Sequence, residues 1–192
     1  MWKDLRADYV KHGGTLRNTA YWAIAVYRYG RWAMEQRGLT GWVANKIYGI
    51  LFLFIELATG IMLHREVKVG EGFHLVHSGN IKIHPEVVIG DRVGIMHDVT
   101  IGTLPKTPGV PRLGNDVFIG SGAKILGPLT IGDGGRVASN SLVFSDVPPG
   151  ATAIGVPARI IHFTGRTQNP AAVPETPKEQ PSQSLEGKHP EV

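Results

Sequence analysis

Cysteine is missing from this 192-residue chain. A disulfide scaffold, a thiolate nucleophile and a cysteine-ligated zinc or iron–sulfur site are therefore excluded. The chain also lacks the G-x-S-x-G turn of many hydrolases, the G-x-x-x-x-G-K-[ST] phosphate loop and any run of lysine and arginine. We therefore expect neither nucleophilic hydrolysis nor nucleic-acid binding, while the net charge of +4 leaves an anionic small ligand open.

Long apolar segments are scarce as well. The longest unbroken apolar run, Ile47 to Ile55, ends at Glu56 and is shorter than the ~20 residues of a membrane span. We expect a buried helix here and no membrane span, although peripheral contact with a membrane stays open. Because the first residues lack the apolar core and cleavage site of a secretory signal, we expect a cytoplasmic protein.

Glycine, by contrast, is abundant, with 25 residues, and this favours a fold rich in turns. An aliphatic residue recurs at every sixth position in two runs, and glycine often follows it. The two runs are Ile83, Ile89, Ile95 and Ile101, then Leu113, Ile119, Ile125, Ile131, Val137 and Val143. Neither a helix nor an alternating strand has a period of six, whereas a short strand and a turn on each face of a triangular prism does. The repeat therefore predicts a parallel β-helix with three repeats per coil.

The chain divides into three parts on this basis. Residues 1–62 are expected to form a small α-helical region, with helices from Leu16 to Gln36, capped by Gly38, and from after Thr40 to near Gly60. Residues 63–164 are expected to form the β-helix, from which the proline-rich segment 102–112 leaves as a mobile loop. Residues 165–192, rich in Pro, Gln, Glu and Ser, are expected to form a disordered tail. The fold class is thus mainly β, a parallel β-helix preceded by helices.

Two groups of side chains suggest sites, each beside a plainer explanation. Counting the coils places His77 and His97 on adjacent coils along one edge, where they are either surface residues or part of a site. A metal site including His74 and His84 is a weaker alternative, because no acidic residue accompanies them at a typical spacing. An aromatic stripe in the first predicted helix is explained by helix packing or by a lipid or sugar site: Tyr21, Trp22, Tyr27, Tyr29 and Trp32.

About one hundred residues resemble bacterial serine acetyltransferases. The resemblance rests on His77-Ser78-Gly79, Asp98-Val99-Thr100-Ile101-Gly102, Gly122-Ala123-Lys124-Ile125-Leu126-Gly127 and Gly155-Val156-Pro157-Ala158-Arg159. It implies a left-handed β-helix, a homotrimer with its active site between neighbouring prisms, and acetyl-CoA-dependent transfer to a hydroxyl without a metal. It also implies that His77 is the catalytic base and that the coenzyme contacts fall on Gly102, Gly122, Ala123, Lys124, Pro157, Ala158 and Arg159.

The chain departs from that family at positions that concern the acceptor. Val76 and Met62 stand where the family has an aspartate, and Gly109-Val110-Pro111 replaces the Arg-His-Pro of the loop. A zwitterionic amino acid needs charged partners. We therefore favour a saccharide acceptor, as in surface polysaccharide biosynthesis, over the L-serine of cysteine biosynthesis, with His97 as an acceptor-site candidate. A non-catalytic trimeric scaffold is the third hypothesis.

Overall fold

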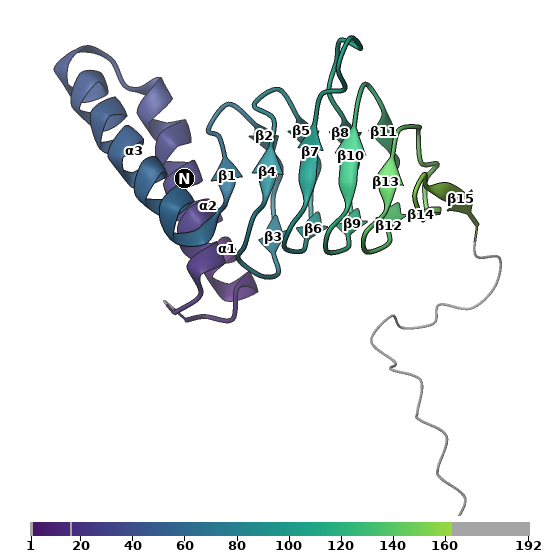
Figure 1. Ribbon diagram of the computed structural model, residues 1–192. Coiled ribbons are helices and arrows are strands. Elements are labelled where there is room, and N and C mark those ends of the chain that lie inside the picture. The colour runs from purple at the N-terminus through teal and green to yellow at the C-terminus, as the bar shows by residue number, and fades with distance from the viewer. Residues whose placement is uncertain (1, 16, 163–192) are drawn as a thin grey trace, which may run out of the picture.

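The computed structural model describes residues 2–15 and 17–162 (Figure 1). Three helices, α1 (Trp2–Lys11), α2 (Thr19–Glu35) and α3 (Gly38–Thr59), precede a solenoid of short strands. In Figure 1 the helices gather at the end of the solenoid where β1 (Met62–Leu63) lies. The predicted tail at 165–192 lies outside the described residues.

The solenoid has three sheets, and each sheet takes every third strand up to β13. One consists of β1, β4 (Lys82–Ile83), β7 (Thr100–Gly102), β10 (Lys124–Leu126) and β13 (Leu142–Val143). The second consists of β2 (Lys68–Val69), β5 (Val88–Ile89), β8 (Arg112–Leu113) and β11 (Thr130–Ile131). The third consists of β3 (His74–Leu75), β6 (Gly94–Ile95), β9 (Phe118–Ile119), β12 (Arg136–Val137), β14 (Thr152–Ile154) and β15 (Arg159–Ile161). All pairings are parallel except that of β14 with β15, so the predicted parallel β-helix is confirmed.

The strand register follows the six-residue repeat. Ile83 pairs with Ile101, three repeats later, and Leu75 pairs with Ile95 across the expected two-residue slip. Ile101 pairs with Ile125, and the extra length between them leaves the prism as the protruding loop visible between β7 and β8 in Figure 1. Because β7 includes Gly102 and β8 begins at Arg112, this loop covers residues 103–111.

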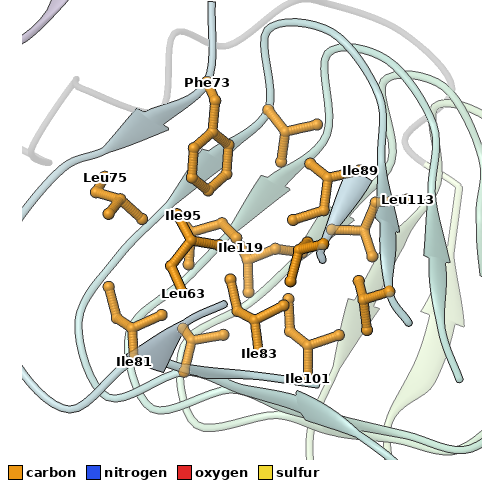
Figure 2. Packing of buried hydrophobic residues seen from close by; sticks show 14 of the residues in the cluster. Leu63, Phe73, Leu75, Ile81, Ile83, Ile89, Ile95, Ile101, Leu113 and Ile119 are labelled. Atoms are coloured by element: carbon orange, nitrogen blue, oxygen red, sulfur yellow. The ribbon is translucent and has the colours of Figure 1, made fainter. Parts of the chain in front are cut away.

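The aliphatic residues of the repeat fill the inside of the prism. Figure 2 shows side chains from all three sheets pointing toward one another, among them Ile83, Ile95 and Leu113. Every repeat aliphatic from Ile83 to Val143 is buried. This continuous core stabilises the coils at roughly 1.5–3 kcal/mol per buried aliphatic side chain.

A ladder of side-chain acceptors runs along one corner of the solenoid. The backbone N–H of Glu71 donates to Asp91 Oδ1 at 2.8 Å, that of Asp91 to Asn115 Oδ1 at 2.9 Å, and that of Asn115 to Asp133 Oδ1 at 2.7 Å. A Cβ at Gly114 would lie 2.2 Å from Asp133 Oδ1. The glycine of the repeat is therefore required where the carboxylate of the next coil comes close.

The two predicted helices are confirmed, with changes at their ends. Gly60 ends α3 in the left-handed conformation, with φ of 68°, as a C-terminal glycine does. Gly38 is instead the first residue of α3, and Gln36 caps α2 in an extended conformation. The helix α1 is not predicted from the sequence.

The prediction that Ile47 to Ile55 forms a buried helix is wrong in this chain. Only one side of α3 packs against α2 and the first coil, and nine of its large apolar side chains are exposed. By length and composition α3 is also the one helix among the described residues that could cross a membrane. The prediction fails because the apolar composition of a helix does not indicate how many of its sides pack against other elements.

Side chains of the helices cap the backbone of the first coil. Tyr27 donates its hydroxyl to the Val67 carbonyl at 2.8 Å, and the Tyr48 hydroxyl accepts from the Arg65 N–H at 3.2 Å. On α1, His12 Nε2 accepts from the N–H of Leu75 at 3.2 Å. Backbone groups at the open end of a sheet need such partners. Helix packing thus accounts for Tyr27 in the aromatic stripe.

Candidate active site

His77 and His97 lie on adjacent coils, as the coil count predicts. Each follows a strand of the third sheet, β3 and β6, which pair in register. Their ring centroids are 5.9 Å apart, and both side chains are exposed. Gly79 lies close, because a Cβ there would be 3.8 Å from that of His97. The two imidazoles therefore form one pair on the corner between the third and first sheets.

A groove of about 500 Å³ opens beside His77. One wall is the segment Val76 to Ser78, and the other comes from the connection between α1 and α2, with Thr15, Arg17, Asn18 and Thr19. Thr19 Oγ1 donates to Ser78 Oγ at 2.7 Å and links the two walls. No local sequence signal connects these segments, since they are about sixty residues apart, so the sequence analysis misses Arg17 at this groove.

Two of the predicted coenzyme residues, Gly122 and Ala123, lie at the same corner on the next coil along the chain. The N–H of Gly122 donates to the carbonyl of His97 at 3.1 Å, so Gly122 lies one coil above the histidine pair. Gly122 has φ of +74°, a conformation that favours glycine. Ala123 is fully buried, and its backbone carbonyl accepts from the N–H of Thr100 at 3.0 Å, so this residue lies beneath the surface of the corner. Gly102 lies at the other end of β7, where the protruding loop begins.

Lys124 is held by Asp98 rather than extending from the surface. Its Nζ donates to the carbonyl of Asp98 at 2.6 Å and to Asp98 Oδ1 at 3.2 Å. Asn80 Nδ2 donates to the same carboxylate oxygen at 3.0 Å. In the absence of a ligand, the Asp98 carboxylate partly neutralises the charge of Lys124. A phosphate that binds Lys124 would therefore compete with this carboxylate.

The remaining predicted coenzyme residues lie near the C-terminal end of the solenoid, where Ala158 follows the first sheet and Arg159 belongs to β15 of the third sheet. The N–H of Ala158 donates to the carbonyl of Leu142, and Leu142 pairs with Lys124. Pro157 follows a cis peptide bond and is exposed, as is Arg159 on β15. The structure therefore places Lys124 and Ala158 in one column on the first sheet, with Arg159 as an exposed cation nearby in sequence.

A second pair of histidines joins α1 to the solenoid behind the groove. The rings of His12 and His74 are 4.8 Å apart, edge to face. Because His12 Nε2 accepts a hydrogen bond from Leu75 and Nδ1 faces the carbonyl of Asp8 at 2.6 Å, the proton of this ring is on Nδ1. Burial, and then the proximity of His12, Lys11 and His77, lowers the pKa of His74 to about 4.

The weaker alternative of the sequence, a metal site, needs a cluster of ligating side chains, and residues 2–15 and 17–162 contain none. No three His, Asp or Glu side chains gather there in a way that could hold an ion. His74 pairs with His12 rather than with His77, and His84 Nδ1 accepts from the N–H of Glu86.

Short parallel strands in a three-sided prism, repeating every six residues, define the chain as a hexapeptide-repeat β-helix protein. Comparison with known proteins narrows the class. A serine acetyltransferase of Helicobacter pylori strain J99 is 43% identical over 122 residues, which are 61% of this chain and 71% of that protein. A serine acetyltransferase of Salmonella typhimurium is 35% identical over 147 residues, or 74% of this chain and 51% of that protein. The chain belongs to the serine acetyltransferase family.

Solved structures agree with this assignment. Serine acetyltransferase from Brucella abortus strain S19 in complex with coenzyme A superposes with a TM-score of 0.71 and 30% identity, covering 85% of this chain and 67% of that chain. The soybean apoenzyme gives a TM-score of 0.69 and 31% identity, covering 82% and 66%. No family model matches the chain. The chain spans about half the length of the Salmonella relative.

Proposed function

We propose that the chain is an acetyl-CoA-dependent O-acetyltransferase that acts on L-serine, with His77 as the general base. The observation that carries the proposal is the pair of exposed imidazoles, 5.9 Å apart, one coil below Gly122 in a member of this family. The names of the relatives and the coenzyme A complex of the Brucella protein support the donor and the acceptor.

The proposed reaction needs one proton carrier. Neutral His77 takes the proton of the acceptor hydroxyl while its oxygen attacks the thioester carbonyl of acetyl-CoA. A backbone N–H stabilises the oxyanion that forms. When the C–S bond breaks, the ester is released and the leaving thiolate takes the proton from His77. No covalent acyl-enzyme forms, in keeping with a chain that has no cysteine.

The donor would lie along the first sheet. The backbone of half-buried Gly122 would border its pantetheine arm near the start of this sheet's β10, Gly102 lies buried at the end of β7, and the exposed Arg159 can meet its phosphates. Lys124 would exchange Asp98 for a phosphate oxygen. In a homotrimer, which the resemblance implies, a second prism would close the open groove beside His77.

Arg17 bears on the choice of acceptor. The saccharide preference of the sequence analysis rests on missing charges, yet Arg17 lines the groove with His77 and is the cation that a serine carboxylate needs. The comparisons lend no support to the saccharide and fit L-serine better. A saccharide is the second candidate, because Val76, Met62 and Gly109-Val110-Pro111 provide no carboxylate for the ammonium group of serine.

The test follows release of the CoA thiol with L-serine, simple sugars and nucleotide- or lipid-linked sugars as acceptors. We expect turnover of L-serine by the full chain, and a ~10²–10⁴-fold loss of kcat/KM in His77→Ala. Binding of CoA, measured by titration calorimetry, should not change in that variant, since the imidazole acts on the hydroxyl. His97→Ala should lose less activity.

The matched control is His162→Ala, an exposed histidine at the far end of the solenoid, which should keep full activity. Undiminished turnover by His77→Ala would contradict the assignment of the base. Turnover of a sugar with serine inert would replace the first candidate by the second. Turnover of none of these acceptors would favour the third hypothesis, a non-catalytic scaffold.

A further inference from the structure

The outer side of α3 is an unusually large apolar surface. Nine exposed side chains of this one helix form it, and we call them the α3 face: Leu39, Trp42, Val43, Ile47, Ile50, Leu51, Leu53, Phe54 and Leu57. Figure 1 shows α3 together with α2 at the end of the molecule where the solenoid begins. Exposed apolar patches of this kind mark contact surfaces for a partner or a membrane.

The opposite side of α3 has a polar character halfway along its length. Asn45 Oδ1 accepts from the guanidinium of Arg65, and Asn45 Nδ2 donates to the Gly41 carbonyl at 2.7 Å. The Arg65 guanidinium also lies over the Tyr48 ring, 4.5 Å from its centroid. A charged group at the middle of a membrane span is strongly unfavourable. α3 therefore cannot cross a bilayer in this fold, but it can lie in the plane of one.

Charge is distributed unevenly between the two parts of the chain. Residues 1–60 contain eight basic and four acidic residues, whereas residues 61–192 contain twelve of each. The whole net charge of +4 therefore belongs to the helical region. Two of its cations are exposed at α3, namely Arg37, which directly precedes the helix, and Lys46 within it. Such cations are attracted to the phosphate groups of an anionic lipid surface.

We propose that the α3 face binds the surface of an anionic membrane, with the helix parallel to the bilayer plane. The apolar residues enter the boundary of the acyl chains, and the cations meet the lipid phosphates. Trp42, on the same face, is a residue type enriched at that depth. A second copy of the chain fits less well, because pairing two such faces would bring two regions of net charge +4 together.

The test uses the full chain and flotation with two kinds of vesicle, one of phosphatidylcholine alone and one of phosphatidylcholine with phosphatidylglycerol. We expect stronger binding to the anionic vesicles, weakened by salt. Brominated lipids should quench the tryptophan fluorescence of the unaltered chain more than that of Trp42→Phe, because the chain has three other tryptophans. The double variant Ile50→Glu/Phe54→Glu should lower the partition constant at least about tenfold. It should not unfold the chain, since both side chains are exposed.

The matched control is Val10→Glu on α1, because Val10 is 69% exposed and Phe54 is 66% exposed. This variant adds one negative charge to the helical region away from the α3 face, whereas the double variant adds two, and it should bind almost as the unaltered chain does. The single variant Phe54→Glu, which adds the same charge on the α3 face, should bind more weakly than Val10→Glu. Thermal unfolding of these variants and of the double variant, followed by circular dichroism, checks that all remain folded.

Three results would overturn the proposal. The first is the absence of binding to anionic vesicles, and the second is equal binding by the double variant and the unaltered chain. The third is a larger assembly in solution that the double variant dissociates, with no affinity for vesicles; the α3 face would then join copies of the chain. Equal binding to both vesicle types would remove the role given to the cations.

Discussion

In the solenoid every repeat aliphatic from Ile83 to Val143 is buried, whereas α3 exposes nine large apolar side chains. Both regions are rich in apolar residues, so composition does not separate them. The difference lies in how each finds neighbours. A coil is covered by the coils above and below it, which carry the same pattern, while α3 has α2 and the first coil on one side only. A repeating structure thus supplies its own core, and a helix beside it depends on what comes next to it.

The largest expected effect is on the free energy of unfolding, when one isoleucine in each region is replaced by alanine. Ile119 is 0% exposed and Ile50 is 71% exposed. We expect Ile119→Ala to lower the free energy of unfolding by about 2–5 kcal/mol, because it leaves a cavity among close-packed side chains. Ile50→Ala should change it by less than about 0.5 kcal/mol. Urea unfolding of both variants gives the comparison, and equal effects would mean that the α3 face is covered in solution.

Glycine to alanine substitutions should have opposite signs in the two regions. Gly122 has φ of +74°, and a Cβ there would lie 2.0 Å from Asn140 Oδ1. Gly122→Ala should therefore destabilise the chain by about 1–3 kcal/mol. Gly49 lies inside α3 with open space around it, so Gly49→Ala should stabilise by up to about 1 kcal/mol. Melting temperatures that shift in the same direction would contradict this contrast.

Acid should weaken the junction between the two regions. Burial and the nearby His12, Lys11 and His77 lower the pKa of His74 to about 4, so the folded chain binds fewer protons than the unfolded chain below pH 6.5. Stability from this residue is therefore complete above pH 6.5 and is lost as the pH falls toward 4. After screening by solvent the loss is about 1–2 kcal/mol.

The variant His74→Gln isolates this contribution from other groups that titrate in acid. It should lose less stability than the unaltered chain between pH 7 and the acid range, as measured by urea midpoints. His162→Gln, which alters an exposed histidine far from α1, should follow the unaltered chain. A loss in His74→Gln equal to that of the unaltered chain would show that the junction does not depend on His74 protonation.

The solenoid could be predicted in detail because its information is local and repeated. The period of six fixes which residues point inward, and counting the coils brings His77 and His97 together. The two-residue slip shifts the phase of the repeat once, between Leu75 and Ile83, and the protruding loop lengthens the step from Ile101 to Leu113 to two repeats. With both counted, the pairing of Ile101 with Ile125 could be anticipated.

The helical region could be predicted only in part, because its contacts join distant segments without a pattern. The periodic apolar residues indicate α2 and α3, but nothing in the sequence indicates that Arg17 lines the groove of His77 or that His12 caps Leu75. The burial of α3 is wrongly predicted for the same reason. Apolar side chains are stabilised when another surface packs against them, but the sequence of α3 does not indicate which surface does so.

The ladder from Asp91 through Asn115 to Asp133 has a consequence for how such chains change over generations. In each coil, an Asp or Asn side chain accepts a hydrogen bond from a backbone N–H of the coil before it. A backbone N–H of the same coil donates to the corresponding side chain of the coil after it. Duplicating or deleting one whole coil in the gene would leave every remaining hydrogen bond of this kind with a partner. The number of coils, and with it the length of the prism, is therefore free to evolve separately from the chemistry carried at any one corner.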